Sequence, residues 1–323
     1  MILDFLKKHC WLFLVVVLLC SCASDADEAA HEISILNWNL ETFFDAHLDG
    51  NEYAEFRSAK SNWGKEKYAA RLKRLGEVLK TVDADVVVME ELEKKEQLYD
   101  IFNALSGGFD LAKAYKYGAF ASASGASIGC AVISRFPLSD VLVHEVYAEG
   151  KGKMPSMRPI LQVNVRVDGK NLPLFVNHWK SKAGGAEESE FWRDAQEENL
   201  SRLMKGALDA DGSAIAAGDF NRDISEFCRQ ESGGANIQLK GAEQLSVYSP
   251  WLGTNASDIG SYWYKDHWER IDHFFVCGNV TISAFSPQTG GDWADEEGKP
   301  KRYTLYNGAG YSDHLPILCR VQM

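Results

Sequence analysis

A run of valines near residue 87 constrains the fold of this chain more than any other segment. Asp85–Met89 contains three consecutive valines, and a short, continuously apolar stretch of this kind is typical of a strand buried on both faces. Glu66–Val82, just before it, carries apolar residues at helical spacing among lysines and arginines, which predicts an amphipathic helix. A helix beside a doubly buried strand indicates a layered α/β fold.

The alternation of short apolar runs and longer helical patterns continues along the chain, without an internal repeat. Further strands are predicted at Ile33–Asn39, Ile128–Ser134, Leu161–Val167, Leu172–Asn177, Ala214–Gly218, Ile271–Val276 and Ile317–Val321. Further helices are predicted at Lys94–Leu105 and Glu187–Leu208. Residues 231–268 hold glycines, serines and clustered aromatic residues, so we expect loops that either border a substrate cleft or form a packed surface insertion.

The N-terminus has the features of an export signal. Lys7 and Lys8 precede the apolar run Trp11–Cys20, which is too short to span a membrane comfortably. The segment Leu19–Cys22 resembles the site at which a bacterial lipoprotein is cleaved and acylated, with Cys22 as the lipidated residue. Residues 1–21 are therefore predicted to be a lipoprotein signal peptide, and an ordinary secreted protein with a chance cysteine is the alternative.

The segment after the predicted cleavage site is polar. Residues 22–32 are acidic and lack apolar periodicity, which predicts a flexible tether. Residues 33–323 would then form the catalytic domain, which we expect to be monomeric. This organisation predicts a protein held on the membrane through Cys22, in the periplasm or at the cell surface.

The chain is acidic. Its 46 Asp and Glu residues outnumber 34 Lys and Arg residues, which gives a formal net charge of -12. Loss of residues 1–21 removes two lysines and one aspartate and leaves -13. The electrostatic field of such an acidic protein repels long polyanions.

Four cysteines lie beyond Cys22, and none of them has the close paired spacing of a zinc site. Cys130 and Cys277 lie within apolar runs and are predicted to be buried.

Several predicted strands end abruptly in side chains suited to binding a metal or phosphate, or to transferring a proton. These residues are Asn39, Glu90, Glu91, His178, Asp219, Asn221, Asp272, Asp313 and His314. Taken singly, each is also explained as a helix cap or a surface group. Their order along the chain is therefore the more informative observation.

Six positions carry a resemblance by their order along the chain: Asn39, Glu91, His178, the segment Gly218–Asn221, Asp272 and the segment Ser312–His314. This order resembles the pattern of the endonuclease/exonuclease/phosphatase superfamily. Deoxyribonuclease I, apurinic-site endonucleases, sphingomyelinases and inositol-polyphosphate phosphatases belong to it. The resemblance covers about residues 33–321. It implies a four-layer α/β/β/α sandwich, in which two mostly antiparallel sheets are flanked by helices and the site lies at one end between the sheets.

The resemblance also implies a metal site that agrees with the residue types. The carboxylate of Glu91 and the amide oxygen of Asn39 are hard ligands that suit Mg²⁺ or Mn²⁺ rather than Zn²⁺. By resemblance, Asp313 is a second contact to the metal or to its water. Glu90 stands where relatives usually carry Gln, and this departure is expected to add a negative charge beside Glu91.

The remaining site residues have roles in proton transfer and phosphate binding by resemblance. Asp219 orients or deprotonates the attacking water, and Asn221 contacts a phosphate oxygen. Asp272 hydrogen-bonds to His314 and raises its pKa, so that an imidazolium faces the phosphate. His178 matches the second histidine of deoxyribonuclease-like members, which implies a general acid toward the leaving group.

Three cations beside the motif strands are candidates for holding substrate phosphate: Arg158, Lys180 and Arg222, of which Lys180 is the best placed. Solvated salt bridges are the alternative. A basic cleft would consist of Lys180, Lys182, Arg193 and Arg222. The motif neighbours Trp38, Trp179 and Trp268 are expected either to stack on a base or sugar or to pack in the core.

The sequence thus predicts an exported endonuclease or phosphodiesterase that acts on phosphoesters, with nucleic acid as the expected substrate. A sphingomyelinase-like enzyme or an inositol- or sugar-phosphate phosphatase on the same fold is the alternative. A non-catalytic scaffold lipoprotein is disfavoured because all the expected site residues are present. His47, His144, His267 and His273 match no motif and are expected to be structural.

Overall fold

The computed structural model describes residues 31–106, 113–148, 154–228, 236–242, 244–255 and 258–323. The predicted signal peptide, Cys22 and the tether up to residue 30 lie outside the described residues. In the part of the chain that is described, no helix is both long and apolar enough to cross a membrane.

Two large sheets form the body of the domain. The first has the strand order β14-β15-β1-β2-β4-β3, and the second has the order β5-β6-β7-β8-β13-β10-β9. The strands of the first sheet are β1 (Glu32–Phe43), β2 (Val86–Leu92), β3 (Tyr117–Ala121), β4 (Gly129–Ser134), β14 (Thr281–Pro287) and β15 (Ile317–Gln322). The strands of the second are β5 (Leu138–His144), β6 (Ile160–Val167), β7 (Lys170–His178), β8 (Ser213–Asp219), β9 (Asn236–Gln238), β10 (Ser246–Tyr248) and β13 (Asp272–Gly278). A separate two-stranded ribbon consists of β11 (Tyr262–Tyr264) and β12 (His267–Glu269).

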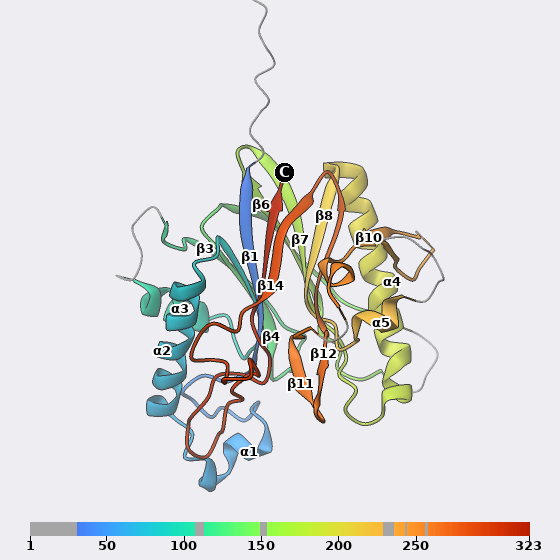
Figure 1. Cartoon of the computed structure of the whole chain (residues 1–323). Coiled ribbons are helices and arrows are strands. Elements are labelled where there is room, and N and C mark those ends of the chain that lie inside the picture. Colours follow the sequence, from blue (N-terminus) through green and yellow to red (C-terminus); the bar gives the residue numbers. More distant parts are fainter. Residues whose placement is uncertain (1–30, 107–112, 149–153, 229–235, 243, 256–257) are drawn as a thin grey trace, which may run out of the picture. The chain divides into compact units, whose positions relative to one another are not determined.

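Helices cover the outer face of each sheet. The helices are α1 (Ala54–Arg57), α2 (Lys65–Val82), α3 (Gln97–Leu105), α4 (Ala186–Asp211) and α5 (Ile224–Phe227), with 3₁₀ turns at Ala59–Ser61 and Pro250–Gly253. In Figure 1, α2 and α3 lie on one side of the two sheets and α4 and α5 on the other. This arrangement confirms the predicted four-layer α/β/β/α sandwich.

Each sheet contains one parallel strand pair among antiparallel neighbours. β1 pairs with β2 in parallel, and β7 pairs with β8 in parallel. Parallel neighbours need a long crossover, and α2 and α4 lie within the two crossovers. The carboxyl ends of the strands in each pair therefore lie at the same edge of their sheet. This places residues from four strand ends together, between the two sheets.

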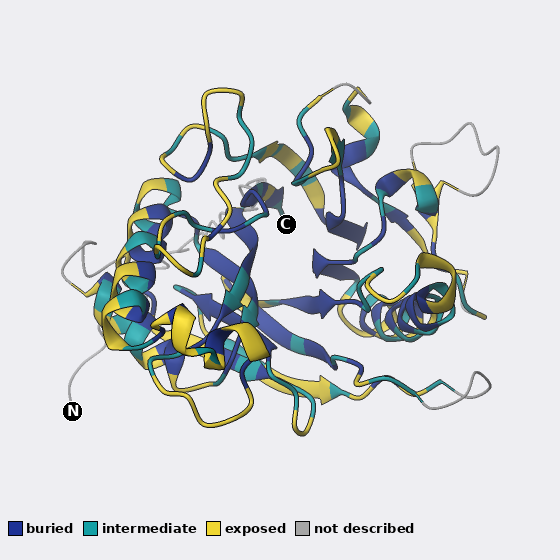
Figure 2. Cartoon of the chain, turned by 90° about the horizontal axis from the view of Figure 1, so that it is seen from below, coloured by how far each residue is buried: buried dark blue, intermediate teal, exposed yellow. Residues whose placement is uncertain are grey.

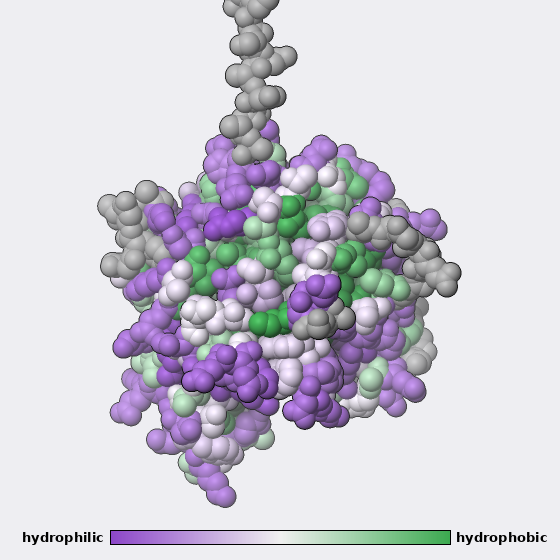
Figure 3. Space-filling view, viewed as in Figure 1, coloured by the Kyte–Doolittle hydropathy of each residue, from purple (hydrophilic) through white to green (hydrophobic). Residues whose placement is uncertain are grey.

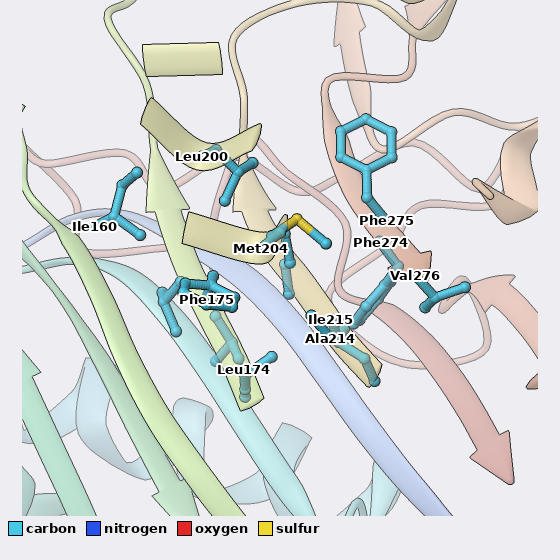
Figure 4. Packing of buried hydrophobic residues seen from close by; sticks show 14 of the residues in the cluster. Ile160, Leu174, Phe175, Leu200, Met204, Ala214, Ile215, Phe274, Phe275 and Val276 are labelled. Atoms are coloured by element: carbon cyan, nitrogen blue, oxygen red, sulfur yellow. The ribbon is translucent and has the colours of Figure 1, made fainter. Parts of the chain in front are cut away.

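Alternating side chains divide the buried residues into two cores. Ile33 and Ile35 of β1 belong to a core that extends through the second sheet to α4, whereas Leu36 and Trp38 belong to a core shared with α2 and α3. Figure 4 shows residues of α4 packed near those of β7 and β8 in the first of these cores. Seen from below, buried residues occupy the strands, and exposed residues lie on the outward faces of the helices (Figure 2).

The structure contains elements that the sequence patterns did not predict. β3, β5 and β14 were not predicted, and residues 231–268, expected to be loops, include β9 to β12. Each of these last four strands has only three residues, too few to show a period of two. β5 is an edge strand of the second sheet, and its residues are mostly exposed. It therefore lacks the buried apolar run by which the other strands were predicted. Cys130 and Cys277 are buried, as predicted.

Candidate active site

The residues at the four strand ends meet in one pocket of about 820 Å³. Of the predicted site residues, those that line the pocket are Asn39, Glu91, Arg158, His178, Asp219, Asn221, Asp313 and His314. Asp272 lies directly behind His314. Lys180 and Arg222 are not among the lining residues. The sandwich thus brings together side chains that are up to 275 residues apart along the chain, counting from Asn39 to His314.

Irregular backbone at the ends of β1 and β2 orients the carboxylates. The pairing of these strands shifts register between Asn39 and Phe43, and β2 is irregular again beside Glu91. Glu91 has a positive φ of 69°, a conformation that costs a non-glycine residue roughly 1–3 kcal/mol. Its Oε2 accepts a hydrogen bond of 2.6 Å from the Thr42 amide, which supports this conformation. Glu91 therefore lines the pocket, whereas Glu90 remains buried.

Glu90, which stands where relatives usually carry Gln, is a buried carboxyl group. It is fully buried, and neither carboxyl oxygen has a hydrogen-bond partner among the described residues. Burial, followed by the charges of Asp272 and Asp219, raises the pKa of Glu90 well above its usual value. This direction favours the neutral form, which is close in shape to the Gln of the superfamily pattern, and the expected negative charge beside Glu91 stays a prediction.

The Asn39 amide links the two carboxylates of the pocket. Its Nδ2 donates to Asp219 Oδ2 at 3.0 Å and lies 3.5 Å from Glu91 Oε1, while its Oδ1 accepts from the Glu41 amide. Carboxylate and amide oxygens suit a hard divalent cation. An amide oxygen has two lone pairs, so Asn39 Oδ1 retains one for a metal or its water.

The acidic residues of the pocket do not form a tight cage. Among the described residues, the only three His, Cys or acidic side chains close enough to share an ion are Asp49, Glu52 and Glu93. Lys94 already pairs with Asp49 and Glu93 there. Glu91 and Asp313 both line the pocket, and among the described residues neither belongs to a group of three such side chains with ligand atoms within 4.8 Å of one another. This suits Mg²⁺, which keeps several waters and binds through one or two carboxylates.

Asp219 is held on a turn that only glycine permits. Gly218 has a φ of 144°, and a Cβ atom there would lie 1.9 Å from the Asn177 carbonyl oxygen. Asp219 Oδ1 accepts a hydrogen bond of 2.8 Å from the Asn221 amide. Burial, followed by the charge of Asp272, raises the pKa of Asp219 to about 7. A carboxyl group with this pKa is suited to accept a proton near neutral pH.

The two histidines of the pocket have pKa values shifted in opposite directions. His314 Nδ1 lies 2.8 Å from Asp272 Oδ2. Burial alone would lower the pKa of His314, but the charge and hydrogen bond of Asp272 raise it well above its usual value. His178 is fully buried, and burial, followed by the charge of Arg158, lowers its pKa well below its usual value. These directions favour the charged form of His314 and the neutral form of His178, and the general-acid role of His178 stays a prediction.

Arg222 cannot reach a substrate in this structure. Its side chain is fully buried and forms ion pairs with Glu190, Asp194 and Glu197. Arg222 instead anchors the turn that carries Asp219 against α4, since Glu190, Asp194 and Glu197 all belong to that helix. The expectation that Arg222 binds substrate phosphate is therefore corrected.

Of the four residues of the predicted basic cleft, only Lys182 lines the pocket. Lys180 Nζ donates to the backbone oxygens of Ser181 and Ala183 rather than pointing into the pocket. Arg193 is buried beneath α4 residues. Lys182 lines the pocket, but it pairs with Glu226 at 2.7 Å. The basic side chains that follow strand ends in the sequence thus interact with neighbouring protein groups. The sequence pattern does not predict these interactions.

Two arginines line the pocket instead. Arg158 was a candidate, and its guanidinium donates to the Trp179 carbonyl oxygen at 3.3 Å. Arg302 was missed because it lies in the long connection between β14 and β15, far from any predicted strand. Its Nε donates to Glu41 at 2.6 Å, and its terminal nitrogen lies 3.7 Å from Asp313. Burial, followed by the charge of Asp313, raises the pKa of Glu41 to about 7.

Tyrosines line the pocket, and the tryptophans beside the motif residues follow the packing alternative. Trp38 and Trp179 are buried in the core, and Trp268 packs on Trp263. The tyrosines of the pocket are Tyr53, Tyr262, Tyr264, Tyr303 and Tyr306. Tyr262 and Tyr264 belong to residues 231–268, which were expected either to border a substrate cleft or to form a packed insertion. Because both tyrosines line the pocket, their positions favour a segment that borders a cleft. His47, His144, His267 and His273 lie outside the pocket lining.

A two-sheet sandwich with carboxylates, an amide and an imidazolium at one end is the architecture of a class of phosphoester hydrolases. A profile described as the endonuclease/exonuclease/phosphatase family matches residues 34–323. The chain belongs to this family. Members of the family are phosphoester hydrolases, and the family and the fold together support that class of activity here.

Solved structures share the fold at low sequence identity. TDP2 from Caenorhabditis elegans is 16% identical with a TM-score of 0.58, over 90% of this chain and 75% of that one. D. rerio TDP2, complexed with a single-strand DNA product, is 19% identical with a TM-score of 0.56, over 90% and 99%. An endonuclease/exonuclease/phosphatase family protein from Bacteroides thetaiotaomicron is 15% identical with a TM-score of 0.57, over 91% and 96%. A search of curated proteins gave no match.

Proposed function

We propose that this protein is an exported phosphodiesterase that uses Mg²⁺ or Mn²⁺ and an activated water to cleave a nucleic-acid strand. The observation that carries the proposal is that a pocket carboxylate, Glu91, faces a base with a pKa near 7, Asp219, beside the imidazolium of His314. Support for a nucleic-acid substrate comes from the D. rerio TDP2 structure, which holds a single-strand DNA product.

Glu91, Asn39 and Asp313 would hold the metal. Glu91 Oε1 is the best placed of their oxygens, because it lines the pocket and has only long contacts, to Asn39 at 3.5 Å and His178 at 3.7 Å. A divalent cation supplies Lewis-acid stabilisation of the negative charge that develops on phosphate. Asp313 lies 3.9 Å from His314 Nε2, so the metal side and the imidazolium side of the pocket adjoin.

Asp219 accepts the proton of the attacking water. Its Oδ1 is fixed by the Asn221 amide and its Oδ2 by Asn39 at 3.0 Å, so the carboxylate keeps one orientation. Asn221 orients Asp219 and, through its own side chain, lies within reach of a phosphate oxygen at the pocket wall. A general base works best when its pKa is near the working pH. A large fraction of it is then deprotonated, and it still binds a proton strongly enough to take one from water.

His314 binds the phosphate. Asp272 fixes its Nδ1, so its Nε2 faces the pocket as a charged donor to a non-bridging oxygen. His178 has its Nε2 3.6 Å from Asp219 and 3.7 Å from Glu91, so its ring lies between the two carboxylates. Arg158 and Arg302 contribute positive charge at the pocket walls.

The proposal includes export and anchoring. Residues 1–21 act as a signal peptide, Cys22 carries the lipid, and residues 22–32 separate the membrane from a monomeric catalytic domain in the periplasm or at the cell surface. Cys22→Ser is expected to move the protein from the membrane fraction to the soluble fraction of fractionated cells. A variant that stays in the membrane fraction would contradict the anchor, and a dimer in size-exclusion chromatography would contradict the monomer.

The activity is tested by incubating the purified protein with single-stranded DNA, RNA, bis(p-nitrophenyl) phosphate, sphingomyelin and inositol phosphates. Each reaction is run with Mg²⁺, with Mn²⁺ and with EDTA, beside a His314→Gln variant. We expect metal-dependent cleavage of nucleic acid that the variant loses by at least about 100-fold. Turnover confined to lipid or sugar phosphates would keep hydrolysis but replace the substrate. No turnover of any compound would contradict the proposal.

A further inference from the structure

The β11–β12 ribbon has two different faces. Trp263 and Trp268 lie directly opposite each other across its two strands, with ring centroids 5.1 Å apart, and Lys299 Nζ lies 4.2 Å from the centroid of Trp263. Side chains alternate between faces along a strand, so Tyr262 and Tyr264 point the other way. Both tyrosines line the pocket, whereas neither tryptophan does. The tryptophan face holds the ribbon in place, and the tyrosine face belongs to the site.

The tyrosines extend a row of rings outward from the catalytic imidazole. The centroid of Tyr262 lies 4.7 Å from that of His314, with the ring planes inclined by 36°. The next centroid, that of Tyr264, lies 5.9 Å from Tyr262, and these two rings are nearly parallel at 19°. The backbones of Tyr262 and His314 also form a bridge. The row therefore keeps a fixed position relative to the imidazolium.

The outer ring is available to a ligand. Tyr264 is 43% exposed, although most large aromatic side chains of a protein are buried. Exposed Lys265 lies over its ring at 5.0 Å and is a flexible cation that can yield to a ligand. The lower part of the face in Figure 3, where β11 and β12 lie, is covered by hydrophilic and neutral residues.

The charges of the pocket favour recognition by rings over recognition by cations. The carboxylates that line it are Glu41, Glu55, Glu91, Asp219, Glu269 and Asp313, and the Lys and Arg side chains are Arg158, Lys182 and Arg302. Two of these three cations are paired with carboxylates, Lys182 with Glu226 and Arg302 with Glu41. A chain of phosphates would meet net repulsion here. A flat ring stacks on tyrosine without regard to charge.

We propose that Tyr262 and Tyr264 form a stacking subsite for a flat ring, of the nucleobase type, that is joined through a sugar to the phosphate bound at His314. The inference rests on the proposed phosphodiesterase function and narrows its substrate to a nucleotide or a short unpaired strand. A paired base presents only its edge, so a duplex does not satisfy the subsite. Glu269, opposite Tyr262 on the ribbon and also in the pocket lining, is an acceptor for the amino or hydroxyl groups of the ligand.

The test measures binding of three compounds to the purified full chain by calorimetry in Mg²⁺: thymidine 5′-monophosphate, ribose 5-phosphate and inorganic phosphate. We expect the nucleotide to bind at least about five-fold more tightly than the sugar phosphate. This ratio corresponds to the lower end of the range of free energies for stacking of a base on an aromatic side chain. Tyr264→Ala is expected to remove this difference, and Tyr264→Phe to keep it. The control is Tyr99→Ala, since Tyr99 is also an exposed tyrosine, at 71% exposure, and lies on α3 outside the pocket lining.

Equal affinities for the nucleotide and the sugar phosphate in the unaltered protein would overturn the stacking subsite. A loss in Tyr306→Ala but not in Tyr264→Ala would also overturn it, because Tyr306 lines the pocket from outside the ribbon. Absence of phosphate binding together with absence of turnover would overturn the phosphodiesterase function instead. Unfolding midpoints close to that of the unaltered protein establish that each variant is folded.

Discussion

The imidazole of His314 lies 2.8 Å from the carboxylate of Asp272, through its Nδ1 and the Asp272 Oδ2. Both groups are buried, and they come from strand β13 and the connection that precedes β15. This contact distinguishes the two pocket histidines, because it raises the pKa of His314 while burial lowers the pKa of His178. In the proposed mechanism, phosphate binding at His314 therefore depends on one carboxylate that does not itself line the pocket.

Asp272→Asn is expected to reduce kcat by about 100-fold or more at pH 8, since loss of the carboxylate charge removes the main cause of the raised pKa of His314. A group that must stay protonated limits the rate as the pH rises through its pKa. The alkaline limb of the pH–rate profile should therefore move to lower pH in the variant. A profile with an unchanged alkaline limb would show that His314 does not act as the imidazolium.

Glu91→Gln is expected to weaken Mg²⁺ binding by about ten-fold or more, because an amide replaces the pocket-lining carboxylate at the end of β2. Part of the lost activity should return at high Mg²⁺ concentration. Asp49→Asn is the matched control, since Asp49 belongs to the acidic group that already contains Lys94. The measurement is activity as a function of Mg²⁺ concentration. A larger effect of Asp49→Asn would place the metal at that group instead.

Glu90→Gln is expected to stabilise the metal-free protein at neutral and alkaline pH. The pKa of Glu90 is raised in the folded state, so the folded chain binds a proton that the unfolded chain releases, and folding stability is lost as the pH rises. The unaltered protein should lose up to about 1.4 kcal/mol per pH unit from this one group, and the variant should lose less. Denaturant unfolding in EDTA at pH 6 and pH 8 checks this, and parallel losses in both proteins would refute it.

Gly218→Ala is expected to lower the free energy of unfolding by at least about 2 kcal/mol, because the added Cβ meets the Asn177 carbonyl oxygen at a φ that alanine rarely adopts. Gly206→Ala is the control. Gly206 lies in α4 with nothing within 4 Å of an added Cβ, so alanine there should stabilise by up to about 1 kcal/mol. Denaturant unfolding of both variants provides the comparison. Equal effects at the two positions would contradict the close approach at Gly218.

The fold was largely predictable because buried strands and amphipathic helices have their own periodicities. The strand at Val86–Val88 and helix α2 were both predictable from the pattern of apolar side chains alone. The layer order came from the family resemblance, since periodicity does not determine which sheets pack together. β11 and β12 were not predictable, because their three-residue strands are stabilised by tertiary contacts such as the Trp263–Trp268 pair.

The site was predictable where a strand end fixes a side chain, as at Asn39 and Asp219. It was not predictable where a charged residue has a choice of partners. Arg222 follows Asn221 in sequence, but the carboxylates of α4 bind it away from the pocket. Arg302 lies in an irregular connection and reaches the pocket only because Glu41 binds it. The charge of Glu90 likewise depends on burial, which the sequence position alone does not give.

The measurement that tests the central claim most directly is cleavage of single-stranded DNA by the unaltered protein and by Asp219→Asn, each in Mg²⁺ and in EDTA. Asn keeps the size of Asp219 and one acceptor oxygen for the Asn221 amide, but it cannot accept the water's proton. The account predicts cleavage by the unaltered protein only with Mg²⁺, and a rate at least about 100-fold lower in the variant. Cleavage that persists in EDTA, or a variant as active as the unaltered protein, would contradict it.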